Sequence, residues 1–595
     1  MGYKIFTLKS FFTTFFAVLL AMFAFFFIIF ILFAAIAGSV VSDKEESVSA
    51  KSVMYIDLSK SFSEKQTENP LLLFTGNKQD ELPSLYELVR LIQKAKADTA
   101  IKGIYIKANF SANGYAASEE IRAALIDFKK SGKFIISYSD VLTQKAYQVA
   151  SVANKVYCNP KGGVEWEGFG VEYTFFKNLI DRLEIDPQIF YAGKFKSATE
   201  PFRVDKMTDA NRLQTSIWLN DVYNRFLSDI SVSRNIDTAL LRKYANEMSV
   251  ETPEDAVRLK LIDGIKYDDE VKAEIRQRLK ISEDEKISFV TIGSYLNAVK
   301  ISEFGKTDKI AVVMAEGEIV DGESKEDGIA SEEYVTLIRK LRTNKNIKAI
   351  VLRVNSPGGS SYASEQIWRE LSLAQKAGKP VVVSMGDVAA SGGYYIACLG
   401  DSIFAQPNTI TGSIGVFAII PNMGSFLKNK IGVTFDGVNT SPNGSEMSVV
   451  KPLSPIQKKI IQREIDRVYV NFKQRIADGR KLDTAYVDSI AQGRVWTGER
   501  AVKIGLVDKL GSLDDAILAA SRLAKIKAYN VRIYPEPVSP FDKLFKSETY
   551  INTSKIIENE IGKENIELFN QIKVLKSNSG VIQARLPFIM NHSSH

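Results

Sequence analysis

The chain has 595 residues, of which 45% are hydrophobic and 25% charged, a composition typical of a globular protein long enough for two or more domains. Its net charge of +7 is spread along the chain rather than clustered, so a nucleic-acid partner is not indicated. Two cysteines and two histidines are present, and neither pair indicates a metal site.

The N-terminal segment 1–48 is predicted to hold a transmembrane anchor. No charged residue occurs from Phe11 to Ser42, and a span needs about 20 apolar residues. Lys4 and Lys9 precede this run and three acidic residues follow it, so the positive-inside rule leaves the N-terminus in the cytoplasm and the large domain outside. Removal after Ala37, within a stretch that resembles a signal-peptidase site, is the alternative.

The middle of the chain is predicted to be an internal duplication. Ile101–Asn109 mirrors Ile347–Asn355, and Ser118–Ile121 mirrors Ser364–Ile367 at the same offset. In each copy, short β-branched runs alternate with helical patterns, which predicts an α/β fold around a buried sheet.

These repeats divide the chain. We expect one α/β domain at about residues 49–300 and a second at about 301–535, followed by a polar, partly helical tail at 536–595. The sequence does not indicate what the tail does. Cys158 and Cys398, one in each domain, are expected to be buried reduced thiols; a disulfide between them stays open because it depends on their separation.

The most informative motif is Gly386–Ala397, which follows the apolar run Pro380–Ser384 and opens a helix of small residues. Small neighbours allow the backbone to approach a substrate, and a helix N-terminus favours developing negative charge. Ser391 is therefore a candidate nucleophile. The histidines, His592 and His595, both lie in the last four residues, so we expect that the base for Ser391 is not a histidine.

The two copies differ where chemistry is expected. Aligning them places Gln144 opposite Ser391, and the first copy also lacks the diglycine Gly358-Gly359. It carries instead Lys196, which has no lysine near its equivalent position in the second copy. A neutral lysine amine can take a serine proton if its pKa falls from about 10.4 toward neutrality, and serine–lysine pairs are variants of the catalytic triad. Most lysines are solvated surface charges, so these residues alone do not single out Lys196.

Gly386–Ala397, Asn355–Gly359 and Thr411–Gly415 resemble, in order and spacing, the motifs of the signal peptide peptidase A family, also called protease IV. Lys196–Phe202 is similar to the lysine-bearing motif of its long, duplicated form. The resemblance covers about residues 50–530. It implies two tandem domains with the crotonase/Clp-protease-like α/β fold, behind an N-terminal transmembrane helix, in a homotetramer with an apolar interior.

The resemblance also implies a function. Ser391 would be the nucleophile and Lys196 the general base of a serine endopeptidase, with an oxyanion hole formed by Gly359 and Gly392 and with Ser413 orienting the lysine. The implied substrates are remnant signal peptides. The implied location is the bacterial inner membrane, with a single lipid-embedded helix and the catalytic domains on the periplasmic side. No cofactor and no metal are expected.

Three other interpretations compete with this one. A crotonase-type acyl-CoA enzyme would use the diglycine to polarise a thioester, but it would need carboxylate acid/base groups. A catalytically inactive membrane scaffold or chaperone would need neither Ser391 nor Lys196. The Ser391 segment taken alone is also compatible with close helix packing. Asp387 is interpreted as a helix cap or structural carboxylate rather than a catalytic group.

Overall fold

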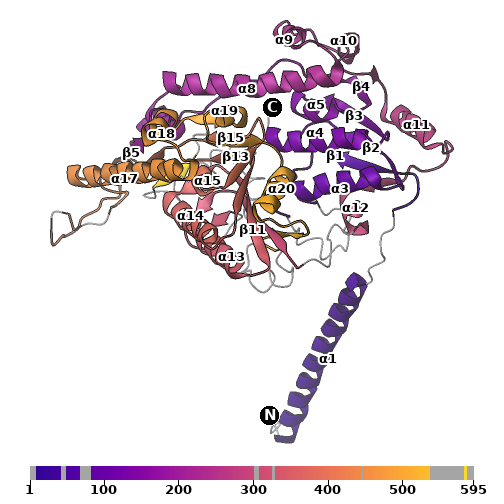
Figure 1. Ribbon diagram of the computed structural model, residues 1–595. Coiled ribbons are helices and arrows are strands. Elements are labelled where there is room, and N and C mark those ends of the chain that lie inside the picture. The colour runs from indigo at the N-terminus through magenta and orange to yellow at the C-terminus, as the bar shows by residue number, and fades with distance from the viewer. Residues whose placement is uncertain are drawn as a thin grey trace.

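The computed structural model describes residues 8–41, 48–66, 82–299, 307–323, 328–441, 443–444, 447–536 and 582–585. Within these residues the protein is an α/β structure in which helices pack on three β-sheets, while helix α1 (Leu8–Val41) lies apart from the sheets (Figure 1). Over the residues described, no helix combines the length and apolar character needed to cross a membrane.

The first sheet is parallel and buried on both faces. Ile104 and Ile106 of its strand β2 pack into the cluster that contains the helices α3 and α4, while Tyr105 faces a second cluster that contains α11. This explains the nearly continuous apolar strands, as expected of a parallel sheet covered on both sides. The strand order is β6 (Gly264–Ile265), β4 (Lys155–Val164), β3 (Phe134–Leu142), β2 (Ile101–Lys107), β1 (Ser52–Asp57) and β7 (Phe289–Thr291).

Most helices of the first half lie around this sheet (Figure 1), but α6 and α7 lie near strand β5 (Asp186–Ala192). The helices of this half are α3 (Leu85–Ala97), α4 (Tyr115–Lys129), α5 (Gln144–Ala150), α6 (Lys177–Arg182), α7 (Glu200–Arg203), α8 (Asp209–Arg234), α9 (Thr238–Asn246), α10 (Pro253–Arg258), α11 (Asp268–Leu279) and α12 (Ile292–Ala298).

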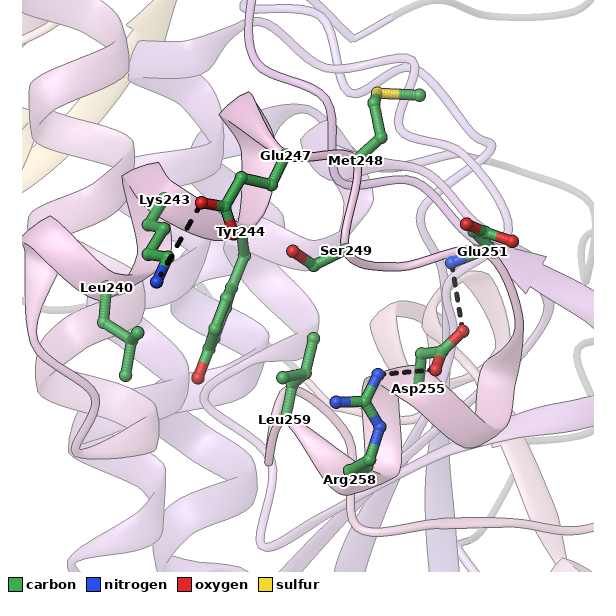
Figure 2. Close-up of a pocket in the computed structure, with 10 residues that line it drawn as sticks. All are labelled: Leu240, Lys243, Tyr244, Glu247, Met248, Ser249, Glu251, Asp255, Arg258 and Leu259. Atoms are coloured by element: carbon green, nitrogen blue, oxygen red, sulfur yellow. Dashed lines mark hydrogen bonds and ion pairs between the residues drawn. The ribbon is translucent and has the colours of Figure 1, made fainter.

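A pocket lies at the periphery of this half, on α9, α10 and the segment between them (Figure 2). Half of its ten lining residues are charged, and four of these five form ion pairs: Lys243 pairs with Glu247 at 3.9 Å and Arg258 with Asp255 at 2.6 Å. Neither Ser391 nor any other predicted site residue lines it. This pocket is therefore not the candidate active site.

The second sheet belongs to the second half. Its strand order is β17 (Val495–Thr497), β15 (Ile410–Gly412), β13 (Val381–Ala390), β11 (Ile347–Ser356), β8 (Lys309–Glu316) and β19 (Asn530–Tyr534); β14 (Ser402–Ala405) joins β13 to β18 (Lys509–Leu510). All these pairs are parallel except β15 with β17. The helices of this half are α13 (Ser331–Thr343), α14 (Ser361–Lys376), α15 (Gly392–Ala397), α16 (Gly424–Phe426), α17 (Pro455–Arg480), α18 (Thr484–Ile490), α19 (Gly498–Lys503) and α20 (Leu513–Leu523).

The two halves repeat the same tertiary contact behind their third long strand. The Tyr394 hydroxyl donates to the Leu506 carbonyl at 2.7 Å, and the Tyr147 hydroxyl donates to the carbonyl of Leu261. Both tyrosines are fully buried. Equivalent hydrogen bonds at equivalent positions agree with a duplication in which each half builds its own buried sheet.

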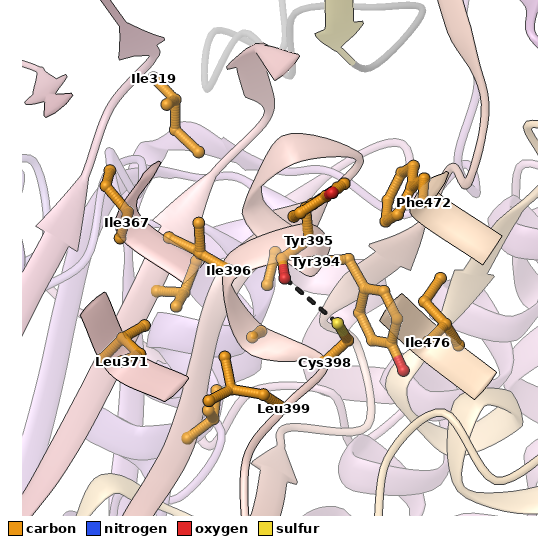
Figure 3. Packing of buried hydrophobic residues seen from close by; sticks show 14 of the residues in the cluster. Ile319, Ile367, Leu371, Tyr394, Tyr395, Ile396, Cys398, Leu399, Phe472 and Ile476 are labelled. Atoms are coloured by element: carbon orange, nitrogen blue, oxygen red, sulfur yellow. Dashed lines mark hydrogen bonds between the residues drawn. The ribbon is translucent and has the colours of Figure 1, made fainter. Parts of the chain in front are cut away.

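The short helix α15 is fixed by the core of the second half (Figure 3). The Tyr395 ring lies 4.7 Å from the ring of Phe472 on α17, and the Cys398 thiol donates to the Tyr395 carbonyl at 3.2 Å. Cys398 and Cys158 are both buried and free. Burial raises the pKa of the Cys398 thiol to about 12, so this cysteine acts as a small apolar residue.

A buried ionic cluster joins the halves. The Arg353 guanidinium, on β11, lies 2.7 Å from the Glu64 carboxylate and 2.8 Å from that of Glu120, and both carboxylates come from the first half. All three side chains are buried. Gly386 makes room for this cluster, since a Cβ there would lie 2.7 Å from a Glu64 carboxylate oxygen.

The third sheet combines strands from both halves and from the C-terminal segment. Its order is β10 (Ile329–Ala330), β9 (Ile319–Val320), β12 (Gly358–Ser360), β20 (Gln583–Arg585), β16 (Val416–Asn422) and β5 (Asp186–Ala192). Strand β5 comes from the first half and pairs with β16 of the second along seven residue pairs. This exchange brings the chain that follows β5 to the second sheet.

Candidate active site

Ser391 occupies the sharp turn between β13 and α15. Its backbone has φ 55° and ψ −115°, a region that residues other than glycine rarely adopt. The Ser391 N–H donates to the Gly412 carbonyl at 2.8 Å, which holds the turn against β15. Such a strand-to-helix turn is where serine hydrolases of other folds present a nucleophile. The apolar run Pro380–Ser384 leads into β13, which extends from Val381 to Ala390.

Lys196 reaches the site from the first half, on the segment that follows β5. Close backbone contact holds this segment: the Phe195 N–H donates to the Gln492 carbonyl at 2.7 Å. A Cβ at Gly493 would lie 2.6 Å from the Lys196 nitrogen, and Gly193 has φ 112° with the Gln492 backbone equally close. Glycine is therefore needed at both positions for the segment to sit where it does.

The Lys196 amine contacts three oxygen atoms at the end of its side chain. Its Nζ lies 2.9 Å from the Ser391 Oγ and 3.1 Å from both the hydroxyl and the carbonyl oxygen of Ser413. Lys196 is 1% exposed, and Ser391 and Ser413 are fully buried. Burial disfavours the ammonium form and holds the pKa of Lys196 well below 10.5. The arrangement therefore offers a neutral amine in hydrogen-bond contact with a serine hydroxyl.

The two glycines predicted for an oxyanion hole lie together beside Ser391. A Cβ at Gly392 would lie 3.1 Å from the Gly359 nitrogen. Gly358 and Gly359 have φ values of 103° and 155°, and a Cβ at Gly359 would lie 2.0 Å from the Ile319 carbonyl oxygen, so a side chain is excluded there. The backbone of β12 can thus approach the turn at Ser391 closely.

The equivalent place in the first half is closed by a side chain. Gln144 donates to the Gly168 carbonyl at 2.9 Å, and its side-chain oxygen accepts from the N–H groups of Glu167 and Gly168 at 3.2 and 3.1 Å. A glutamine side chain is not a nucleophile, and here both its amide nitrogen and its oxygen form hydrogen bonds with backbone groups. This half contributes Lys196 to the site rather than a site of its own.

Asp387 acts as a helix cap, in agreement with the structural interpretation. Its carboxylate accepts from the N–H groups of Ala116 and Ala117 at 2.8 and 3.2 Å, at the first turn of α4 in the other half. The N-cap residue of α4 is Gly114, which has no side chain to cap the helix. Asp387 supplies the missing acceptor across the interface between the halves.

One supporting residue was not found from the sequence. Gln214, on α8, is 1% exposed and donates to the Phe195 carbonyl and the Ser197 hydroxyl, both at 3.0 Å. It also accepts from the Val495 N–H at 3.3 Å, so it ties the Lys196 segment to the second sheet. A lone glutamine in an amphipathic stretch carries no pattern that distinguishes it from a surface residue.

The site offers no set of metal ligands. In the described part of the chain no three His, Cys, Asp or Glu side chains gather where they could hold a metal ion. His592 and His595 lie outside the described residues. The groups that meet at Ser391 are an amine, hydroxyls and backbone amides, which suit acyl transfer.

Comparison with known proteins gives consistent matches. Peptidase family S49 matches twice, at residues 127–282 and 373–527, and the Clp protease family matches residues 303–411. The chain is 37% identical to Protease 4 of Salmonella typhi over 517 residues, 84% of this chain and 83% of that protein. It is 36% identical to Protease 4 of Haemophilus influenzae over 74% of this chain and 73% of that protein. It is 32% identical to the chloroplastic serine protease SPPA of Arabidopsis thaliana over 74% of this chain and 66% of that protein.

Proposed function

Because the chain belongs to peptidase family S49, the serine peptidases that include Protease 4, we propose that Ser391 and Lys196 are the nucleophile and general base of an endopeptidase. The observation that carries this proposal is the 2.9 Å contact between the Lys196 amine and the Ser391 hydroxyl in a buried site. An acyl-CoA enzyme is not favoured, because the family consists of serine peptidases and no acidic side chain contacts the Ser391 hydroxyl among the hydrogen bonds of the described residues.

Acylation follows from this geometry. The neutral Lys196 amine takes the proton from the Ser391 hydroxyl as the oxygen attacks a peptide carbonyl carbon. The Gly359 and Gly392 N–H groups hold the oxyanion of the tetrahedral intermediate, a contribution of about 3 kcal/mol for a donor in such a hole. The Lys196 ammonium then gives its proton to the leaving amine, the C–N bond breaks and an ester on Ser391 remains.

Deacylation repeats these proton transfers with a water molecule as the nucleophile and Ser391 as the leaving group. Lys196, neutral again, takes a proton from a water molecule that attacks the ester, and the ammonium returns a proton to the Ser391 oxygen. The Ser413 hydroxyl and carbonyl, each 3.1 Å from Nζ, accept hydrogen bonds from the lysine and keep it directed at Ser391 in both steps. Ser413 is thus proposed as the orienting residue.

We propose that the substrates are remnant signal peptides. A signal peptide left by secretion is apolar and extended, and an extended chain can bind by adding a strand to a sheet edge next to the nucleophile. This class of substrate is supported by the family resemblance of three motifs, Gly386–Ala397, Asn355–Gly359 and Thr411–Gly415. Cleavage of a synthetic signal peptide by detergent-solubilised protein tests it, with Ser391→Ala and Lys196→Ala as comparison. Unimpaired cleavage by either variant contradicts the dyad. Absence of cleavage by folded wild-type protein would favour a scaffold.

The location and assembly are proposed on the sequence and the resemblance. Phe11–Ser42 has no charged residue, and the described side chains of α1 include Leu20 and Phe23, which are 73% and 72% exposed. We propose that the uncharged segment Phe11–Ser42 anchors the protein in the bacterial inner membrane, with both crotonase-like domains, 49–300 and 301–535, on the periplasmic side. The proposal rests on the whole segment as it stands in the sequence, of which the structure describes the side chains only in part. A homotetramer completes the proposal, and light scattering in detergent measures that mass.

A further inference from the structure

The turn that precedes β17 contacts both the segment that carries the lysine and the residue that orients it. Its first residue is Gln492, whose carbonyl accepts from the Phe195 N–H at 2.7 Å. Two residues further on, the Arg494 carbonyl accepts from the Ser413 N–H at 2.7 Å. One short turn of the second half therefore holds the backbone on either side of the Lys196 amine.

The Arg494 side chain makes the same connection through aromatic rings. Its guanidinium carbon lies 5.2 Å from the centroid of the Phe195 ring and 4.2 Å from that of the Trp496 ring. Phe195 directly precedes Lys196, and Trp496 lies on β17, where its indole N–H donates to the Ile490 carbonyl at 3.0 Å. A guanidinium in contact with both rings thus links the lysine-bearing segment to an anchored strand of the second sheet.

No ion pair accounts for the position of this arginine. Over the residues that the structure describes, no carboxylate pairs with the Arg494 guanidinium, although the side chain is only partly exposed. Burial and the charge of Arg500 lower the pKa of Arg494, and Arg500 is itself paired with Asp221. The two aromatic rings are therefore the partners that the described chain gives this guanidinium.

Phe195 is held at three points, and this fixes the residue that follows it. Its N–H donates to the Gln492 carbonyl, its carbonyl accepts from Gln214 at 3.0 Å, and its ring contacts Arg494. A displacement of about 1 Å in a reacting group can slow a reaction about 100-fold. Of the three contacts, the ring contact is the one that a substitution at Arg494 removes while both backbone hydrogen bonds of Phe195 keep their partners.

We propose that Arg494 is a positioning residue for the general base. The inference rests on the proposed function of Ser391 and Lys196. The Arg494 guanidinium holds the Phe195 ring next to β17, and so keeps the Lys196 amine at hydrogen-bond distance from Ser391 and shielded from water. Without this contact the lysine-bearing segment shifts, water reaches the amine, and the ammonium form persists to higher pH.

The pH dependence of two reactions tests this inference. One is cleavage of a synthetic signal peptide, and the other is labelling of Ser391 by a fluorophosphonate, which needs no bound peptide. In Arg494→Met the acidic limb of both profiles is expected to move to higher pH by about one unit. The value of kcat/KM is then about tenfold below wild type at low pH and approaches wild type as pH rises. KM should stay near wild type, because the change acts on the base.

Three further variants identify the contact that is responsible. Phe195→Leu should move the acidic limb in the same direction, and the double variant Arg494→Met with Phe195→Leu should move it no further than the larger single shift, because both changes remove one contact. Arg494→Lys keeps the charge but not the planar guanidinium, so a smaller shift is expected. Arg242→Met is the matched control, since the Arg242 guanidinium lies 4.9 Å from the Tyr223 ring on the far side of the first half; its limb should stay at the wild-type pH.

The outcomes separate this inference from the proposed function. If wild type shows an acidic limb and that of Arg494→Met stays in place, or its rate falls by the same factor at every pH, the inference is overturned and the proposed function stands. An equal shift in Arg242→Met also overturns it. If wild type does not cleave, or Ser391→Ala cleaves at the wild-type rate, the proposed function fails and the inference fails with it. Where Arg494→Met does not fold, the shifts of Arg494→Lys and Phe195→Leu decide in the same way.

Discussion

The Lys196 amine lies 2.9 Å from the Ser391 hydroxyl although the two residues are 195 positions apart and come from opposite halves of a duplicated chain. The pairing depends on β5, which leaves the first half to pair with β16 of the second. Each half has thus kept a different part of one site. The dyad is buried together with the interface between the halves, so changes at that interface affect both stability and chemistry.

The rate of peptide cleavage should rise with pH through the pKa of Lys196. Burial holds this pKa well below 10.5, and only the unprotonated amine can take the serine proton. Below the pKa the ammonium form predominates and the acidic limb of the kcat/KM profile falls tenfold per pH unit. Lys196→Met should abolish cleavage at every pH. A double variant, His592→Gln with His595→Gln, should show the same acidic limb in its kcat/KM profile. If the acidic limb is lost when the histidines are replaced, Lys196 is not the base.

A methyl group at Gly392 should slow catalysis more than it destabilises the fold. The added Cβ would lie 2.7 Å from the Ser364 hydroxyl and 3.1 Å from the Gly359 nitrogen, which displaces an oxyanion donor. Loss of one such donor lowers kcat by about 100- to 1,000-fold. Gly163→Ala is the matched control because nothing lies within 4 Å of its Cβ. Equal kcat values for Gly392→Ala and Gly163→Ala would exclude this oxyanion hole.

Removal of the Asp387 carboxylate should destabilise the interface between the halves. Asp387→Ala leaves the Ala116 and Ala117 N–H groups without their acceptor, and the loss of a helix cap costs about 1 kcal/mol of unfolding free energy. Asp387→Asn keeps an acceptor and should cost less. Chemical denaturation measures both values. A catalytic role would instead appear as a large fall in kcat for Asp387→Asn while its stability stays near wild type.

Removal of the buried guanidinium should be the most destabilising single change at the interface. Arg353→Met leaves the Glu64 and Glu120 carboxylates buried without their cation, at a cost of about 3–5 kcal/mol. Burial raises the pKa of Glu64 to about 7, against 4.5 unfolded. A folded-state pKa above the unfolded value means that stability is lost as pH rises. Arg353 lowers the Glu64 pKa, so its removal raises this pKa further; wild type and Arg353→Met then lose stability alike between pH 4.5 and 7, and the defect of Arg353→Met should grow only above about pH 7.

Neutralising the carboxylates provides the control. Adding Glu64→Gln and Glu120→Gln to Arg353→Met should recover part of the lost unfolding free energy and flatten its pH dependence. Denaturation curves at several pH values measure this. A defect of Arg353→Met that stays constant across pH, or that the two glutamines deepen, would show that charge is not its cause.

Ser391 could be predicted from local sequence, because a strand, a sharp turn and a helix of small residues follow one another within a short stretch. Lys196 could not be singled out in this way. Its burial depends on β5 crossing to β16 and on the close approach of Gly193 and Gly493, and such contacts leave no local pattern. Resemblance to a family was needed to choose it among the lysines.

The strand in the C-terminal segment could not be predicted from the sequence for a similar reason. The tail 536–595 is predicted to be polar and partly helical; the structure describes residues 536 and 582–585 of it, and Gln583–Arg585 form a strand. Three residues carry no strand periodicity of their own, and this segment becomes a strand because β12 and β16 offer it two edges. The sequence could therefore describe the nucleophile but not what lies against it.

The central claim is that Ser391, activated by Lys196, forms the acyl-enzyme. Covalent labelling tests this most directly: wild type, Lys196→Met and Ser391→Ala are treated with a fluorophosphonate, and the labelled residue is mapped by peptide mass spectrometry. The account predicts one label on Ser391 in wild type, a strongly reduced label in Lys196→Met and none at this position in Ser391→Ala. Peptide cleavage should be lost in the same two variants. Labelling of a different serine, together with cleavage that persists in Ser391→Ala, would contradict it.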